Sequence, residues 1–171
     1  GPVLTGDLSG YLEKYDIWSS YRPEERGVLI AYASIYGNTA SAALRLRDML
    51  ARRGEKRVAA VDLARSDISR AVADAFRYDA LVLAAPSYDG AVLPPMAAFL
   101  SRLKAKNWQK RTAAVIENGS WAPSAGKVML AALAEMKDVA VLEPMVSIRS
   151  AVSEETATKL NELADALAAR G

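Results

Sequence analysis

Beyond residue 26 the chain alternates short apolar runs with longer segments of helical periodicity, and this alternation limits the possible folds more than any other feature. Residues 27–33 (GVLIAYA) are apolar without polar alternation, which is typical of a strand buried on both faces. Further strands are predicted at residues 58–63, 80–85, 112–116 and 139–142, the last with or without a continuation past Pro144 to Ile148. Helices are predicted at residues 39–53, 67–76, 95–104, 126–136 and 153–169.

Five such strand–helix units predict an α/β fold in which a doubly wound, five-stranded parallel sheet carries helices on both faces. The strand order that fits is 2-1-3-4-5, and its ligand crevice lies at the carboxyl ends of the first and third strands. The chemistry is therefore expected in the loops after the first, third and fourth strands. Residues 27–171 are predicted to form this domain. Residues 1–26 are predicted to be an N-terminal extension or connecting segment, with a short helix at 7–18 and a linker at 19–26.

Two residue types that carry much of enzyme chemistry are missing from the 171 residues. The absence of Cys excludes disulfides, thiolate nucleophiles and Cys-ligated metals, and the absence of His removes the commonest general base and metal ligand. No catalytic residue and no metal site is predicted, so the chemistry must come largely from something that the chain binds.

The charge and hydropathy patterns argue against two classes of partner. The net charge of +2 does not indicate the strongly basic surface that is typical of nucleic-acid-binding proteins. No apolar run approaches the ~20 residues that span a bilayer, and the N-terminus lacks the regions of a signal peptide. A cytoplasmic protein without membrane contact is the expectation.

The loop at residues 34–39 (SIYGNT) follows a predicted buried strand and opens a helix. Backbone N–H groups at a helix start form an anion site, and Ser34, Asn38 and Thr39 add side-chain donors. Gly37 lets the backbone approach a guest closely. The loop has no Lys or Arg, and neither the NTPase P-loop nor the dinucleotide-binding glycine pattern is present.

Residues 32–39 (YASIYGNT) closely resemble the FMN-phosphate loop of flavodoxins, which combines an aromatic residue, a Ser or Thr, a small residue and a final Thr. The resemblance implies a flavodoxin-like fold that holds one FMN without covalent attachment. It assigns six residues to the phosphate: Ser34, Ile35, Tyr36, Gly37, Asn38 and Thr39.

The resemblance also gives roles to the second and third loops. In flavodoxin-like proteins the loop after the third strand borders the isoalloxazine ring, which here points to Pro86, Ser87, Tyr88, Asp89 and Gly90. Asp-Gly is also a common turn dipeptide, and a purely structural turn is the alternative. In the third loop a tryptophan outside any apolar stripe is suited to stacking on the flavin, which gives the set Asn118, Gly119, Ser120 and Trp121.

Together the three loops resemble the flavodoxin domain of A-type flavoproteins, the flavodiiron family, over residues 11 to about 168. In that family a diiron domain precedes the flavodoxin domain, and residues 11–18 (YLEKYDIW) look like the connecting segment. The third loop departs from the family, because many relatives carry Ser-Tyr-Gly-Trp where this chain has Asn118-Gly119-Ser120-Trp121; only the tryptophan is kept.

The family resemblance implies an electron-transfer domain that passes electrons to a diiron oxygen or nitric oxide reductase centre absent from this chain. It implies an electron donor such as a rubredoxin or a reductase, and a homo-oligomeric parent protein. A free-standing flavodoxin and a flavodoxin-like NAD(P)H:quinone oxidoreductase are the alternatives. A receiver-type signalling domain fits poorly, because the first strand ends in Ala33-Ser34 rather than in an acidic pair.

Overall fold

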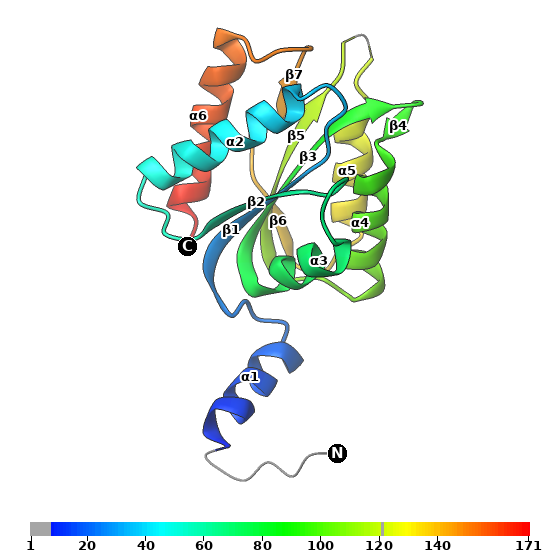
Figure 1. Cartoon of the computed structure of the whole chain (residues 1–171). Helices are drawn as coiled ribbons and strands as arrows, with labels where there is room; N and C mark the ends of the chain where they lie inside the picture. The colour runs from blue at the N-terminus through cyan, green and yellow to red at the C-terminus, as the bar shows by residue number, and fades with distance from the viewer. Residues whose placement is uncertain (1–7, 121) are drawn as a thin grey trace.

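The structure, a computed structural model, describes residues 8–120 and 122–171. Its centre is a parallel sheet that follows the order β2 (Val58–Asp62), β1 (Glu25–Tyr32), β3 (Tyr78–Tyr88), β5 (Arg111–Asn118) and β6 (Val139–Val141). Counted along the chain as parallel strands, this is the predicted order 2-1-3-4-5. The predicted α/β, doubly wound fold is therefore confirmed (Figure 1).

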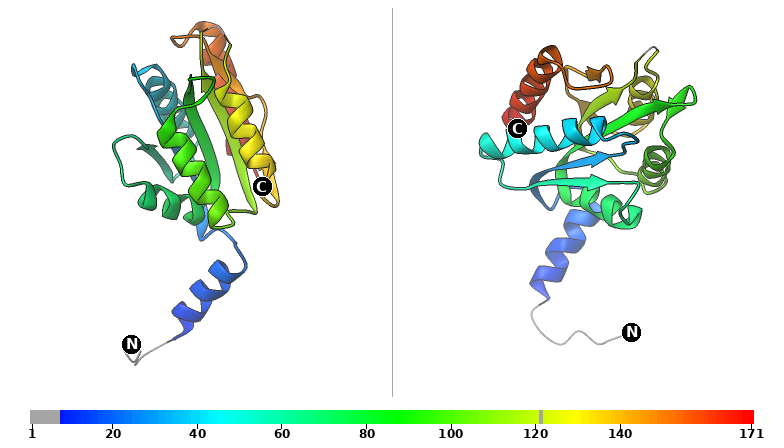
Figure 2. Two further views of the ribbon diagram at one scale, coloured as in Figure 1. Left: turned by 90° about the vertical axis from the view of Figure 1, so that its right-hand side faces the viewer. Right: turned by 45° about the horizontal axis from the view of Figure 1, so that its top comes forward.

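Helices cover both faces of this sheet because its central strands present apolar side chains in both directions. Val28 and Ile30 pack with α2 and α6, whereas their neighbours Leu29 and Ala31 pack on the opposite face, with α3, α4 and α5 (Figure 2). The helices on the sheet are α2 (Asn38–Arg52), α3 (Ile68–Arg77), α4 (Pro94–Ala105), α5 (Ala125–Ala134) and α6 (Glu154–Ala169). Within residues 8–120 and 122–171, no helix has the length and apolar character needed to cross a membrane.

The last predicted strand forms as two pieces. Both β6 and β7 (Val146–Ile148) pair in parallel with β5, the first near its start and the second at its end. Pro144 lies between them, and a proline has no N–H to donate to a strand partner. The strand predicted at residues 139–142 does continue beyond Pro144 to Ile148, but with a break in the pairing.

Two helix starts predicted from single residues are confirmed in detail. The Asp67 carboxylate accepts a hydrogen bond from the N–H of Ser69 at 2.8 Å, and the Ser153 hydroxyl accepts from the N–H of Thr156 at 3.2 Å. Each bond satisfies an N–H that has no partner inside its helix. These side chains therefore fix where α3 and α6 begin.

The N-terminal helix α1 (Ser9–Ser19) points away from the sheet, and none of its residues is buried (Figure 1). It confirms the helix predicted at residues 7–18 from Ser9 onward, Asp7 lying outside the described residues. Large apolar side chains are exposed on it and at its start: Leu8, Tyr11, Leu12, Tyr15 and Trp18. An apolar surface of this kind is typical of a segment that contacts another body.

A buried arginine joins the segment after α1 to the body of the domain. Arg111 is 4% exposed and donates hydrogen bonds to the carbonyl oxygens of Tyr78, Phe76 and Tyr21. Burial lowers the pKa of its guanidinium to about 10, against the opposing charge of Asp79. It therefore stays charged at neutral pH and holds Tyr21 against the starts of β3 and β5.

A second buried arginine, near the C-terminus, holds the end of α6 against the amino ends of the strands. Arg170 forms ion pairs with Asp79 at 2.8 Å and with Glu55 at 2.9 Å, and the same Asp79 carboxylate accepts the N–H of Gly27. Burial opposes ionisation of Asp79, but the hydrogen bonds from Arg170 and Gly27 outweigh it and keep its pKa below the ordinary value. The network ties α6 to β1, β3 and the segment before β2.

We expect the variant Asp79→Asn to be less stable than the wild type at about pH 7, because a neutral amide leaves the Arg170 charge with a weaker partner. The pKa of Asp79 is lower in the folded than in the unfolded protein. Its stabilising contribution is therefore present above the ordinary carboxyl pKa of 3.8 and is lost as the pH falls through the folded value. The difference in free energy of unfolding, measured by urea denaturation, should shrink as the pH falls below 3.8.

The variant Asp165→Asn is the matched control, because its carboxylate is 69% exposed and pairs with Arg53 at the surface. Its stability should follow that of the wild type closely across the same pH range. A difference between wild type and Asp79→Asn that stays constant from neutral to acidic pH would contradict the role given to the network.

Candidate functional site

The loop after β1 turns into α2 at Gly37, whose φ of 88° lies in the left-handed region. Glycine adopts this conformation without steric cost, so the backbone can turn sharply there. The Ser34 hydroxyl accepts a hydrogen bond from the N–H of Gly37 at 3.0 Å and closes the loop. No side chain in the described part of the chain caps α2, so its first N–H groups stay available to a guest.

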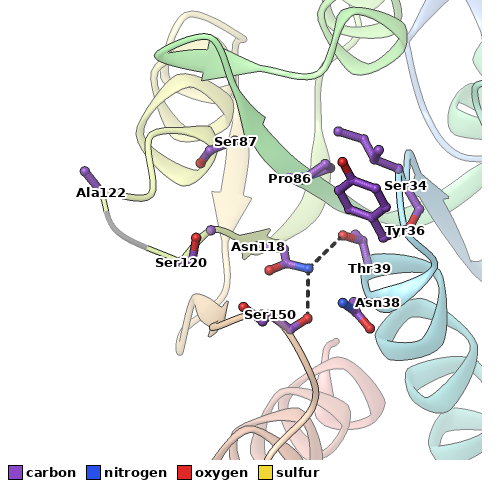
Figure 3. A pocket seen from close by; sticks show the side chains of 12 residues that line it. Ser34, Tyr36, Asn38, Thr39, Pro86, Ser87, Asn118, Ser120, Ala122 and Ser150 are labelled. Carbon is purple, nitrogen blue, oxygen red and sulfur yellow. Dashed lines mark hydrogen bonds between the residues drawn. The ribbon is translucent and has the colours of Figure 1, made fainter.

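This loop is one wall of an open cavity of about 380 Å³ at the carboxyl ends of the parallel strands. Small-molecule sites commonly measure ~300–1,000 Å³. Among the described lining residues there is no Asp, Glu, Lys or Arg, and the polar ones carry only hydroxyl or amide groups, so the cavity attracts a ligand by oriented dipoles rather than by charge. The lining residues come from three loops and from the segment after β7: Ser34, Ile35, Tyr36, Asn38, Thr39, Pro86, Ser87, Asn118, Gly119, Ser120, Ala122 and Ser150 (Figure 3).

Most of the residues predicted to bind a cofactor therefore lie around one cavity. Gly37, Tyr88, Asp89 and Gly90 are not among its lining residues, and Trp121 lies outside the described residues. Two lining residues, Ala122 and Ser150, were not predicted. Ser150 follows the broken last strand, and no local pattern in the sequence points to it.

The second loop is shorter than predicted because β3 continues to Tyr88 and pairs with a short antiparallel strand, β4 (Ala91–Val92). Asp89 and Gly90 connect the two strands with φ values of 51° and 71°. Two central residues with positive φ make the turn that suits the twist of a two-residue hairpin. Asp89 and Gly90 thus form a tight hairpin turn, and their contact with a cofactor stays a prediction.

Ser87 links the second loop to the third. Its hydroxyl oxygen accepts the N–H of Ser124 at 2.7 Å and the N–H of Ala125 at 3.0 Å, and so caps the start of α5. In return, the Ser124 hydroxyl donates to the carbonyl of Ala91 at 2.8 Å. Ser87 lines the cavity, and its hydroxyl oxygen holds two loops together.

A buried carboxylate supports the third loop from behind. Glu117 is 4% exposed, and it accepts hydrogen bonds from the N–H of Gly126 at 2.8 Å and from the Ser147 hydroxyl at 2.7 Å. A Cβ on Gly126 would lie 2.5 Å from a Glu117 carboxylate oxygen, so a larger residue at position 126 would push the Glu117 side chain out of place. Glu117 therefore joins the start of α5 to β7, a function that sequence reasoning missed.

Asn118 connects the third loop to the first loop and to the segment after β7. Its amide nitrogen lies 3.3 Å from the Thr39 hydroxyl oxygen and 3.5 Å from the Ser150 carbonyl oxygen (Figure 3). Thr39 is 1% exposed at the start of α2. The first loop, the third loop and the segment after β7 are thus in direct contact around one end of the cavity.

Comparison with known proteins gives one family and a set of similar folds. A family model described as a flavodoxin domain matches residues 29–159. Among curated proteins, none matches the sequence significantly. Many solved structures share the fold.

Two of these structures have chains much longer than this one, and the third is a flavodoxin that matches over nearly its whole length. Rubredoxin oxygen:oxidoreductase from Desulfovibrio gigas aligns with a TM-score of 0.86 and 19% identity over 94% of this chain, but over only 39% of its own. The flavodiiron protein from Giardia intestinalis aligns with a TM-score of 0.78 and 23% identity, over 95% of this chain and 42% of its own. A flavodoxin from the Archaea aligns with a TM-score of 0.72 and 18% identity, over 83% of this chain and 96% of its own. At these identities the likeness is one of fold, and this chain spans less than half of the first two.

We expect Ser87→Ala to lower the free energy of unfolding by about 1 kcal/mol, because two N–H groups at the start of α5 lose their acceptor. The control is Ser101→Ala, a change on the exposed face of α4, which should leave stability nearly unchanged. Urea denaturation followed by circular dichroism measures both variants. If Ser87→Ala unfolds at the same urea concentration as the wild type, the capping role is wrong.

Proposed function

Because the chain belongs to the flavodoxin domain family, we propose that its cavity holds one FMN without covalent attachment and that the domain transfers electrons through it. A flavin supplies one- and two-electron chemistry, which the side chains of a protein without Cys or His do not offer. The observation that carries the proposal is the uncapped start of α2 behind Gly37, which opens into the cavity among neutral donors.

The start of α2 suits a phosphate group. The helix dipole places roughly half a positive charge there, and the first N–H groups add donors at the same point. Asn38 and Thr39 line the cavity beside these groups, and Ser34 holds the loop closed. We assign the phosphate of FMN to this end of the cavity.

The second and third loops suit the flavin ring. Pro86, Gly119 and Ser120 line the cavity on that side without a charged side chain. Ile35 and Tyr36 are exposed on the rim, 47% and 91%, and Tyr36 offers a flat face near the cavity. We assign the isoalloxazine ring to this side, with the stacking of Trp121 as a further prediction.

We expect the wild type to bind FMN at least about tenfold more tightly than riboflavin, because hydrogen bonds to a charged group are the stronger kind. Thr39→Val keeps the size of the side chain but removes its hydroxyl, and should weaken FMN binding while leaving riboflavin binding nearly unchanged. Titration calorimetry with both flavins measures this, and absorption spectra confirm the bound flavin.

Thr158→Val is the matched control, because that hydroxyl is exposed on α6, where it donates to the Glu154 carbonyl. It should bind both flavins as the wild type does. Equal affinity of the wild type for FMN and riboflavin would overturn the phosphate assignment.

We propose further that the domain works next to a diiron domain, as in the flavodiiron proteins that it resembles in fold. Those structures align over 94% and 95% of this chain, whereas the archaeal flavodoxin aligns over 83%, which is close to the share made up by residues 27–171. The extra matched length corresponds in size to the N-terminal segment that contains α1, whose apolar side chains are exposed. A small redox protein such as a rubredoxin, or a reductase, is the proposed donor.

With reduced FMN and no added protein, the chain is expected to show no catalytic reduction of nitric oxide under anaerobic conditions. A diiron centre needs several histidine and carboxylate ligands, and this chain has no histidine. Turnover should begin when a histidine-bearing diiron domain is added, measured by nitric oxide consumption together with iron analysis. Sustained turnover by the chain alone, with stoichiometric iron, would contradict the proposed partnership.

A further inference from the structure

We propose that Asn118 is a positioning residue that fixes the direction of the Thr39 hydroxyl proton and thereby makes the cavity select phosphorylated over unphosphorylated flavins. This inference rests on the proposed FMN site. It goes further by naming the residue through which a cavity without charged side chains distinguishes the two ligands.

The orientation of the Asn118 amide follows from its two neighbours (Figure 3). The Ser150 carbonyl oxygen, 3.5 Å away, can only accept a hydrogen bond, so the NH₂ group of Asn118 must face it. The same NH₂ group lies 3.3 Å from the Thr39 hydroxyl oxygen. Asn118 is therefore the donor in both contacts.

This donor role determines what the Thr39 hydroxyl can do. A hydroxyl that accepts from Asn118 must direct its own proton elsewhere. Thr39 is 1% exposed and lines the cavity at the start of α2, so the proton is available to a ligand at that end. With no charged side chain among the lining residues, a proton directed at a phosphate attracts it, whereas a lone pair in that direction repels it.

Both ends of this arrangement are held by the backbone. The N–H of Gly119 donates to the Ile148 carbonyl at 3.0 Å, which fixes Asn118 at the end of β5. Ser150 lies at the centre of a three-residue turn, with the N–H of Ala151 bonded to the Arg149 carbonyl at 3.0 Å and a φ of 69°. Such turns are rare and strained, and strained backbone is concentrated at functional sites. The turn keeps the Ser150 carbonyl within reach of Asn118.

A double-mutant cycle tests the proposal, with the ratio of riboflavin to FMN dissociation constants as the readout. In the otherwise wild-type chain, Asn118→Ala should reduce this ratio roughly tenfold. In the Thr39→Val background the same change should have little further effect, because Asn118 acts through the hydroxyl that is already gone. Urea denaturation of each variant shows whether it is folded.

Asn118→Asp provides a second, nearly isosteric variant, in which a carboxylate would accept the Thr39 proton and repel phosphate. Its selectivity should fall below that of Asn118→Ala and recover in part at high salt, since salt screens the added charge. Asn161→Asp adds the same charge beside Arg53, far along α2, and should leave selectivity unchanged.

The outcomes separate this inference from the function on which it rests. Suppose that the wild type selects FMN but that Asn118→Ala weakens the binding of FMN and riboflavin equally; then Asn118 does not act through Thr39. The same conclusion follows if Asn118→Ala lowers the selectivity of Thr39→Val by as much as it lowers that of the wild type. If the wild type does not select FMN at all, the phosphate assignment fails and the role of Asn118 fails with it.

Discussion

The parallel pairing of β1 with β3 is the constraint on which the rest of the structure depends. These strands are neighbours in the sheet although β2 lies between them in the sequence, so later strands are added on the opposite side. The chain leaves β1 for α2 on one face and leaves β3 for α4 on the other. The two loops therefore diverge, and the space between their starts is the cavity.

Much of this arrangement could be predicted because the information is local. Residues 27–33 are continuously apolar, and the loop at residues 34–39 follows them directly. The functions of Ser87 and Glu117 could not be predicted, because Ser87 caps a helix 38 residues away and Glu117 binds a hydroxyl 30 residues away. Ser150 was missed for the same reason, since its backbone reaches the cavity only once β7 has paired with β5. Contacts of this kind exist only after the sheet has formed.

The third loop is where the separate segments of the site are joined. Glu117 holds it to α5 and β7, Asn118 reaches Thr39, and the capping of α5 by Ser87 brings in the second loop. Each connection is a hydrogen bond between neutral groups or to a buried carboxylate, so its geometry depends on the others being in place. A site formed by dipoles needs such mutual support, because a misdirected dipole repels where a misplaced lysine would still attract.

The buried ionic network lies at the opposite end of the sheet from the cavity. Arg170, Asp79 and Glu55 gather at the amino ends of the strands, whereas the loops around the cavity follow the carboxyl ends. The loops around the cavity thus lie apart from the ionic network that fastens α6 to the sheet. Evolution can therefore alter those loops and change what the domain holds, while the distant ionic fastening continues to secure the same scaffold.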